Sequence, residues 1–425
     1  MKVAIVGTGI AGNVVANRLH AAGHDITVFE AGDYVGGHTH THKIELDGEV
    51  HNIDTGFIVF NDWTYPNFIA LLDELGVASQ ESSMSFSVRN ELSGLEYNGT
   101  SLDGLFAQRR NVLRPGFYRM ISEILRFNRE APNLLATDAP ETTLGELLKA
   151  GQYGRDFIEN YLVPMGAAIW STEPRRMLGF PARFFIRFLH NHGMLSVHDR
   201  PTWRVVRGGS ARYVERLVAP FRDRIRLRCP VDRVRRIPEG VMVAARGCQE
   251  QHYNHVFLAC HSDQALRMLA DPSQQERAIL GAIPYQPNEA VLHTDTSLLP
   301  RTRRAWAAWN YHVIDRPGDA VALTYDMNIL QGLASRHTYC VTLNATEHID
   351  SAKVIRRIDY HHPLFTPEGV AAQQRHAEIS GVRRTHYCGA YWRWGFHEDG
   401  VVSALQALRR FEETLDAQRA LPRVA

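Results

Sequence analysis

The sequence has no hydrophobic run long enough to cross a membrane. None of its apolar stretches approaches 18 residues, the length at which a membrane-spanning helix becomes a candidate. The first apolar stretch has only five residues and runs directly into a glycine-rich loop, so we expect it to be a strand and not the core of a signal peptide. The sequence therefore predicts a cytoplasmic protein.

Cysteine and lysine are also scarce. The five cysteines are odd in number and widely spaced, with no Cys-x-x-Cys pair, so we expect free thiols and neither a disulfide framework nor a metal site. Lysines account for only four of the 47 basic residues, and the formal net charge is +1. A chain without a strong positive field is not expected to bind nucleic acid.

The length and the apolar content indicate a large globular protein. A chain of 425 residues, with 44% hydrophobic and 22% charged residues, is long enough for a sizeable core and predicts two domains.

A glycine-rich motif near the N-terminus has the context of a dinucleotide site. The apolar segment Lys2–Val6 predicts a strand, the loop Gly7–Gly12 reads GTGIAG, and a helical pattern runs from about Asn13 to Ala22. A second strand, Asp25–Phe29, ends at Glu30. This strand–loop–helix–strand–acid order is the order that a dinucleotide site requires.

Each part of the motif has a physical role. Gly7 permits the tight turn, Gly9 allows a pyrophosphate to approach the backbone, and Gly12 allows the helix to pack near the strand. The helix N-terminus offers N–H groups and a partial positive charge to phosphates. The carboxylate of Glu30 can accept hydrogen bonds from ribose hydroxyls.

Three histidines alternate just after this unit. His38, His40 and His42 would share one face of a strand, which is compatible with a metal site. No acidic or cysteine cluster accompanies them, so we expect instead that His38 lies where the cofactor phosphates pass and that the site holds no metal.

The middle of the chain changes character. Residues 78–200 carry long helical patterns, and Leu102–Ala131 and Ala182–Leu189 mix aromatic residues with arginines. Such surfaces suit lipid headgroups and acyl chains; the alternative is that they pack between domains with the arginine heads in solvent. The stretch Pro164–Ser171 could line a pocket or belong to the core. Residues 270–375 predict a second, mostly antiparallel sheet.

The C-terminal stretch predicts a second anion site. A strand ends near Gly389 and Ala390, a loop rich in aromatic residues follows, and Gly400 precedes the helical pattern Val401–Leu415. The N-terminus of that helix could therefore bind an anion.

These motifs resemble the FAD-dependent amine oxidase-like superfamily, which includes phytoene desaturases and protoporphyrinogen oxidase. The matching pattern is GxGxxG(x17)EA(x4)GGH from Gly7 to His38, completed by Gly389–Ala390 and Gly400–Ala404. More narrowly, the chain resembles a bacterial subgroup of predicted NAD/FAD-binding proteins.

The resemblance implies an α/β fold with two domains. A Rossmann-like FAD-binding domain of the glutathione-reductase type would be assembled from residues 1–75, 200–265 and 375–425. Residues 76–199 and 266–374 would form a mixed α+β substrate domain. The FAD would be bound non-covalently, because the resemblance points to no cysteine placed for a flavin bond.

The resemblance also implies the residues that hold FAD, from the pyrophosphate and ribose to the adenine and the flavin. These residues are Gly7, Gly9, Ile10, Ala11, Gly12, Glu30, Ala31, Gly37, His38, Gly56, Val231, Gly389, Ala390, Gly400, Val401 and Val402. Many members have an arginine after the glycine pair, so His38 is a departure that weakens one expected ion pair.

The expected catalytic residues lie in the C-terminal loop. Tyr391, Trp392 and Trp394 could wall the substrate pocket or pack between domains. His397, with Glu398, is the nearest acid–base candidate, although the same loop could simply cap the helix, with Asp399 as the cap. Amine oxidases usually carry a lysine near the flavin on a strand that aligns with Asn288–Asp295, and this chain has none there.

The sequence therefore predicts an FAD-dependent oxidoreductase that acts on a lipophilic substrate, such as the acyl chain of a lipid. Subgroup members are often encoded beside cyclopropane-fatty-acyl synthase-like methyltransferases, which suggests a functional link to such an enzyme. The aromatic–arginine surfaces suggest peripheral contact with the inner face of the membrane. The alternatives are an amine oxidase, a flavin-dependent isomerase and a non-catalytic flavin-binding partner of a methyltransferase.

Overall fold

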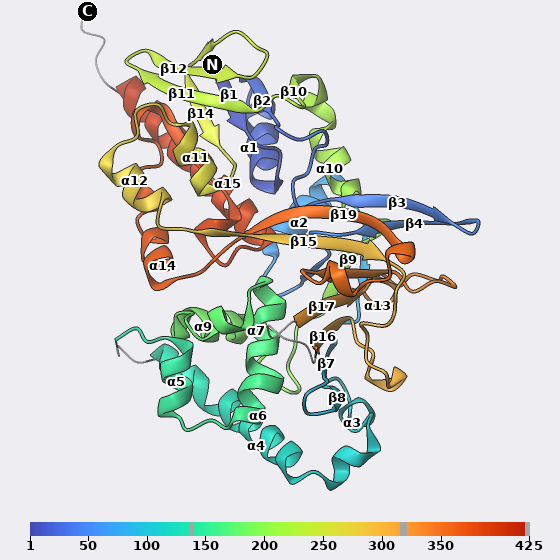
Figure 1. The fold of residues 1–425 in the computed structure, drawn as a ribbon. Coiled ribbons are helices and arrows are strands. Elements are labelled where there is room, and N and C mark those ends of the chain that lie inside the picture. The colour runs from blue at the N-terminus through green and yellow to red at the C-terminus, as the bar shows by residue number, and fades with distance from the viewer. Residues whose placement is uncertain (137–139, 315–320, 421–425) are drawn as a thin grey trace, which may run out of the picture.

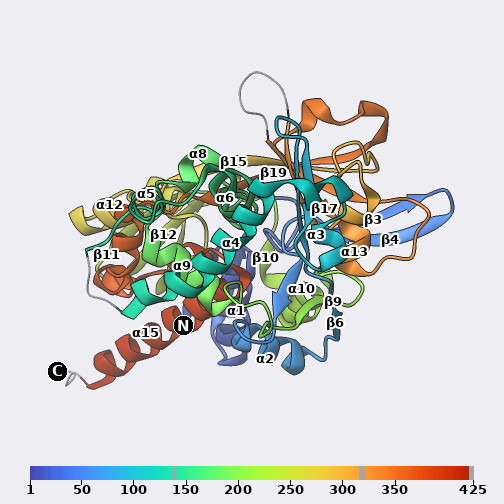
Figure 2. The ribbon, with the colours of Figure 1, turned by 90° about the horizontal axis from the view of Figure 1, so that it is seen from below.

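The computed structural model describes residues 1–136, 140–314 and 321–420. A parallel sheet lies at one end of the molecule, a group of helices lies at the opposite end, and a long antiparallel ribbon crosses between them (Figure 1). The hairpin of β3 (Thr41–Leu46) and β4 (Glu49–Asp54) projects from the body in both views (Figures 1 and 2). Its turn is formed by Asp47 and Gly48, both with positive φ.

The parallel sheet has five strands in the order β10-β2-β1-β14-β20. All four neighbouring pairs are parallel, and a parallel sheet must be covered on both faces. The strands are β1 (Lys2–Val6), β2 (Asp25–Phe29), β10 (Ile225–Arg226), β14 (His255–Leu258) and β20 (Thr385–Tyr387).

Alternate residues of β1 face two different cores. Val3 and Ile5 pack with α1 (Ile10–Ala21) and α15 (His397–Ala420) on one face. Ala4 and Val6 pack on the other face against the three-stranded sheet of β11 (Val231–Ile237), β12 (Gly240–Ala245) and β13 (Gln251–Tyr253). This arrangement explains why the strand reads as a continuous apolar run.

The second sheet has seven strands in the order β19-β15-β18-β17-β16-β7-β8. Its pairs are antiparallel except for β16 with β7, which confirms a mostly antiparallel sheet. The longest strands, β15 (Tyr285–His293) and β19 (Val354–Pro363), form the crossing ribbon (Figure 1). The others are β7 (Phe86–Asn90), β8 (Leu95–Asn98), β16 (Trp309–Val313), β17 (Val321–Asp326) and β18 (Cys340–Leu343).

Helices form the end of the molecule opposite the parallel sheet. At this end, Pro115 begins α4 (Pro115–Glu130), as proline does at a first helical position. Elsewhere in the molecule, Gly76 ends α2 (Pro66–Leu75) in a left-handed conformation. The remaining elements are α3 (Leu102–Leu105), α5 (Leu144–Ala150), α6 (Arg155–Phe157), α7 (Val163–Trp170), α8 (Pro174–Met177), α9 (Ala182–Asn191), α10 (Ala211–Val218), α11 (Ser262–Met268), α12 (Gln274–Leu280), α13 (Met327–Gln331), α14 (Pro367–Gln373), β5 (Val59–Asn61), β6 (Ser79–Glu81) and β9 (Trp203–Val206).

Three sequence-based expectations need correction. The backbone N–H of Asn13 donates to the carbonyl of Gly9 at 3.0 Å, so α1 begins at Ile10 and not at Asn13. In the same way Gly400 donates to Phe396 at 3.2 Å, so α15 begins at His397. Of the three alternating histidines only His42 lies in a strand, because β3 begins at Thr41.

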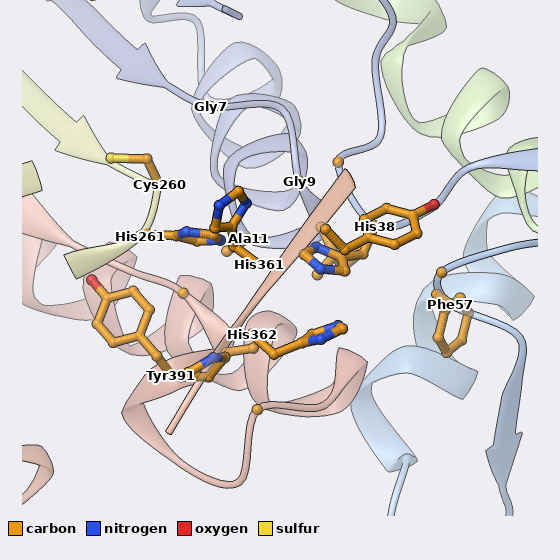
Figure 3. Close-up of a pocket in the computed structure, with 18 of the residues that line it drawn as sticks. Gly7, Gly9, Ala11, His38, Phe57, Cys260, His261, His361, His362 and Tyr391 are labelled. Atoms are coloured by element: carbon orange, nitrogen blue, oxygen red, sulfur yellow. The ribbon is translucent and has the colours of Figure 1, made fainter. Parts of the chain in front are cut away.

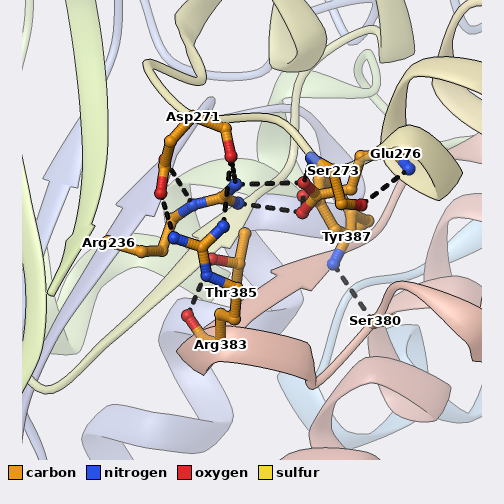
Figure 4. Close-up of polar contacts among 8 residues, drawn as sticks. All are labelled: Arg236, Asp271, Ser273, Glu276, Ser380, Arg383, Thr385 and Tyr387. Atoms are coloured by element: carbon orange, nitrogen blue, oxygen red, sulfur yellow. Dashed lines mark hydrogen bonds and ion pairs between the residues drawn. The ribbon is translucent and has the colours of Figure 1, made fainter. Parts of the chain in front are cut away.

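A buried ion network joins the elements behind the parallel sheet (Figure 4). The guanidinium of Arg236 on β11 donates to both carboxylate oxygens of Glu276 on α12, at 2.8 and 3.0 Å, and to Asp271 at 2.8 Å. The hydroxyl of Tyr387 on β20 donates to Glu276 at 2.6 Å. Burial disfavours the charged carboxylate, yet the hydrogen bonds from Arg236 and Tyr387 leave the pKa of Glu276 lowered.

We expect Arg236→Met to destabilise the protein by about 3–5 kcal/mol, because it leaves the buried carboxylate of Glu276 without its cation. The matched control is Arg233→Met, on the same strand, where the side chain is 58% exposed and an exposed pair contributes about 0–1 kcal/mol. Urea unfolding measures both variants. Equal losses of stability would contradict this role of the buried network.

Candidate cofactor and substrate cavity

A cavity of about 830 Å³ opens where the parallel sheet meets the crossing ribbon. Gly7, Glu30, Ala259 and Gly389 line it, and each lies just past the carboxyl end of a parallel strand (β1, β2, β14 and β20). Ligands bind at this edge of open α/β sheets. Figure 3 shows the glycine loop and the start of α1 above a group of histidine and tyrosine side chains.

The glycines of the loop have different surroundings. A Cβ on Gly12 would lie 2.0 Å from the carbonyl oxygen of Gly7, and a Cβ on Gly7, where φ is +104°, would lie 2.6 Å from that of Ala259. A Cβ on Gly9 would meet nothing within 4 Å, and Gly9 lines the cavity. Gly7 and Gly12 therefore serve packing, whereas the missing side chain of Gly9 leaves space inside the cavity.

Glu30 is held in place beside the loop. Its Oε2 accepts from the backbone N–H of Thr8 at 2.9 Å and from the Thr8 hydroxyl at 2.5 Å, and its Oε1 accepts from the N–H of Gly32 at 2.7 Å. The carboxylate is thus fixed next to the glycine loop, where it also lines the cavity. Thr8 is a positioning residue that the sequence pattern did not single out.

Several histidines line the cavity. His38 lies against the ring of Tyr360, with centroids 4.9 Å apart, and His362 lies 5.1 Å from His38. Burial lowers the pKa of His362 and of His261 to about 4 and that of His38 well below its ordinary value. These imidazoles are therefore neutral at pH 7 and offer hydrogen bonds without adding charge.

His397 is locked in place at the start of α15. Its ring stacks on Phe57 with centroids 3.6 Å apart, and its Nε2 lies 2.5 Å from the hydroxyl of Tyr213. Burial lowers its pKa to about 3. These contacts give His397 a positioning role, and its low pKa does not suit proton transfer near neutral pH.

The two acids after His397 act as helix caps. Glu398 accepts from the backbone N–H of Asn67 and Phe68 at 3.1 and 2.9 Å, at the start of α2, and Asp399 accepts from the N–H of Phe396 at 2.9 Å. Burial raises the pKa of Asp399 from 3.8 to about 7. Because the folded state holds this proton more tightly than the unfolded chain, Asp399 lowers stability as the pH rises from about 4 to 7.

The structure brings most of the sequence-predicted residues to the cavity. Those that line it are Gly7, Gly9, Ile10, Ala11, Glu30, Ala31, Gly37, His38, Gly56, Val231, Gly389, Ala390, Tyr391 and His397. Trp392 instead packs in the core, with its ring 4.3 Å from that of His376. Gly400 allows α15 to pass close to α1, because a Cβ there would lie 2.6 Å from Ile10. Val401, 2% exposed, lies in the core, and Val402 follows it in α15.

Several lining residues were not predicted. Cys260 and His261 follow β14, and their position after a parallel strand could have indicated them. His361 and His362 belong to β19, and no local pattern marks them, because only pairing with β15 brings them to the cavity.

One end of the cavity is aromatic and apolar. Its lining residues come from α7, from the second sheet, from the loop after β19 and from the C-terminal loop: Ile169, Trp170, Trp309, Tyr325, Phe365 and Phe396. The stretch Pro164–Ser171, expected to be a pocket or core segment, contributes to both. No lysine occurs among the described residues that line the cavity.

Amide and imidazole groups lie on the ribbon next to Asn288, the first residue of the segment for which the resemblance implies a lysine. Gln286 and His362 face each other across β15 and β19. The side-chain amide of Asn288 lies 2.6 Å from Nδ1 of His362, and that of Gln286 donates to the carbonyl of Ser171. Of these amide and imidazole residues only His362 lines the cavity, and the carboxyl group of Asp359 on the same strand lines it as well.

The sequence model of flavin-containing amine oxidoreductases matches residues 10–302, more than half of the 425 residues. The chain belongs to this family. FAD is the cofactor typical of its members.

Individual curated relatives match only parts of the chain. A zeta-carotene desaturase of Synechocystis is 37% identical over 76 residues, 18% of this chain and 15% of that protein. The chain thus spans only a small part of this curated relative.

Solved structures match the fold over nearly the whole chain. A cyclohexylamine oxidase of Brevibacterium oxydans superposes with a TM-score of 0.70 at 17% identity, covering 98% and 99% of the two chains. A fatty acid isomerase of P. acnes superposes with a TM-score of 0.67 at 16% identity, covering 96% and 98%. At these identities the likeness establishes the fold.

The cavity fits the cofactor of this family. The space beside Gly9 is open, because a Cβ there would meet nothing within 4 Å. The N-terminus of α1 faces this space, and the carboxylate of Glu30 is fixed beside it, just after β2. A phosphate-bearing dinucleotide matches this set of donors and acceptors.

We expect Gly9→Ala and Gly12→Ala to separate cofactor binding from folding. Overpacking costs about 1–3 kcal/mol, so Gly9→Ala should keep the stability of the apoprotein but bind FAD roughly ten- to a hundredfold more weakly. Gly12→Ala should lose stability instead, because its Cβ meets a backbone carbonyl. Flavin fluorescence titration and urea unfolding measure the two effects. Wild-type affinity in Gly9→Ala would contradict the role assigned to Gly9.

Proposed function

We propose that this protein is an FAD-dependent oxidoreductase that exchanges hydride with the acyl chain of a lipophilic substrate. The observation that carries the proposal is the aromatic, apolar end of the cavity, formed by Ile169, Trp170, Trp309, Tyr325 and Phe365. Such a lining binds hydrocarbon by burying apolar surface. FAD would be held non-covalently by the loop Gly7–Gly12, Glu30 and Gly37.

The chain's own residues have defined tasks in this proposal. Bound FAD supplies hydride acceptance or donation. The aromatic walls exclude water and orient the chain of the substrate. The neutral histidines His38 and His362 provide hydrogen bonds without attracting an ionic headgroup deep into the cavity.

The comparisons with known proteins support a lipophilic substrate in part. Carotenoid desaturases among the curated relatives and the fatty acid isomerase among the similar structures have names that denote lipophilic substrates. An acyl-modifying methyltransferase, as the subgroup resemblance suggests, would be a fitting functional partner.

An amine oxidase is the second candidate. It is favoured by the family match and by the similarity to cyclohexylamine oxidase. The absence of a lysine among the described residues that line the cavity favours the acyl substrate instead. An isomerase or a non-catalytic flavin protein would differ by showing no net flavin reduction.

We also propose that the helical end of the molecule docks on the cytoplasmic face of a membrane. Large apolar residues are exposed on α3, α4 and the short helix Arg109–Leu113: Leu102, Val112, Leu113, Tyr118 and Leu125. The exposed arginines Arg110 and Arg119 lie among them, a composition that suits an anionic interface. None of the described helices has the length and apolarity to cross a membrane.

The docking surface connects to the cavity through the helices. α4 packs against α6, which continues through a π-helical turn, Ile158–Leu162, into α7. The C-terminal end of α7 carries Ile169 and Trp170, which line the cavity. A lipid bound at this surface would therefore lie on the side of the protein that forms the substrate end.

Anaerobic reduction of the bound flavin tests the proposed reaction. We expect acyl lipids to bleach the flavin absorbance and a panel of amines to leave it unchanged. Ile169→Glu should slow the bleaching at least tenfold, because the carboxylate at the apolar end costs several kcal/mol to bury, whereas Ile169→Leu should not. Equal FAD content in both variants is the control. Bleaching by amines and not by lipids would establish the amine oxidase alternative.

Vesicle sedimentation tests the membrane surface. We expect binding to vesicles that contain anionic phospholipid, and a loss of about tenfold or more in Leu113→Glu/Leu125→Glu, because two exposed leucines no longer bury apolar surface. Val382→Glu, at an exposed residue outside this surface, should bind like the wild type. Unchanged binding of the double variant would contradict docking through α4.

A further inference from the structure

Two cysteines outside the cavity are in contact. The sulfur atoms of Cys229 and Cys248 lie 3.5 Å apart. Cys229 precedes β11 and is 6% exposed, while Cys248 follows β12 and is exposed. The proximity follows from the hairpin register, because Val231 pairs with Ala245 and the two chain ends beyond that pair leave the hairpin side by side.

The backbone holds both cysteines in this arrangement. The N–H of Cys229 donates to the carbonyl of Glu30 at 2.8 Å, the N–H of Arg246 donates to the carbonyl of Pro230 at 2.9 Å, and the N–H of Cys248 donates to the carbonyl of Ala245 at 3.0 Å. The backbone conformation of the hairpin therefore brings the two thiols into contact.

We propose that Cys229 and Cys248 form a reversible disulfide in response to a hydroperoxide. The accessible thiol of Cys248 attacks the peroxide, which is reduced to water or an alcohol, and Cys248 becomes a sulfenic acid. The thiol of Cys229 then attacks that sulfur, a disulfide forms and water leaves. The net change oxidises two thiols by two electrons and reduces one peroxide.

The surroundings assign the order of these steps. Burial, together with the neighbouring Cys248 thiol, raises the pKa of Cys229, so the buried sulfur is the less reactive one toward an oxidant from solvent. Once the sulfenic acid forms, the second sulfur is already within contact distance. A disulfide needs the sulfurs about 2.0 Å apart, which requires a movement of about 1.5 Å in the exposed turn that carries Cys248.

The bond would act at the adenosine end of the proposed cofactor site. Cys229 is hydrogen-bonded to the backbone of Glu30, and Val231, two residues on, lines the cavity. Closing a loop of about 20 residues constrains the unfolded chain. The oxidised protein should therefore melt at a temperature several degrees higher than the reduced protein.

Peptide mapping after peroxide treatment tests the site. The purified full chain is treated with hydrogen peroxide, alkylated and digested. We expect a linked Cys229–Cys248 peptide that dithiothreitol removes, together with the rise in Tm. Cys248→Ser should abolish both effects, and Cys340→Ser, at a buried cysteine outside the hairpin, should retain them.

Two outcomes would overturn the proposal. One is oxidation of Cys248 to a sulfinic acid while Cys229 remains open to alkylation after unfolding. The other is a peroxide-induced rise in Tm that persists in Cys248→Ser. Neither result depends on the substrate of the protein, so a failure here is distinct from a failure of the proposed function.

Discussion

The structure depends on the close contact between the start of α1 and the strands beneath it. The missing side chain of Gly12 lets the helix approach the carbonyl of Gly7, and Gly7 in turn lies against the backbone of Ala259. This contact fixes the helix N-terminus above the carboxyl edge of the parallel sheet. Glu30, Cys260 and Gly389 reach the same edge from the neighbouring strands, so the cavity follows from how closely three backbones pack.

The cavity combines a polar end and an aromatic, apolar end. At one end, backbone N–H groups and a fixed carboxylate suit a nucleotide. At the other end, aromatic side chains suit hydrocarbon. The histidines between them are neutral because burial disfavours their charged forms. A charged arginine in place of His38 would extend the polar environment toward the apolar end.

Local sequence predicted the parts of the site that short stretches determine. The unit from Lys2 to Glu30 could be recognised because its strand, loop, helix and acid follow one another without interruption. The start of α15 was predicted too late, because Gly400 was interpreted as a helix boundary when it serves close packing against Ile10.

The histidines of β19 could not be predicted at all from the sequence. Their place is set by the register with β15. The two strands are neighbours in the sheet, but β16, β17 and β18 lie between them in the chain, and residue patterns do not encode such distant pairing. The contact of Cys229 with Cys248 depends in the same way on the hairpin register.

The long helical segment meets the cavity over a very short stretch. Within the described part of residues 76–199, the residues that line the cavity are the three neighbours Ile169, Trp170 and Ser171. A substitution elsewhere in this segment therefore reaches the cavity lining only through the packing around the C-terminal end of α7. The segment is coupled mechanically to the cavity at a single point.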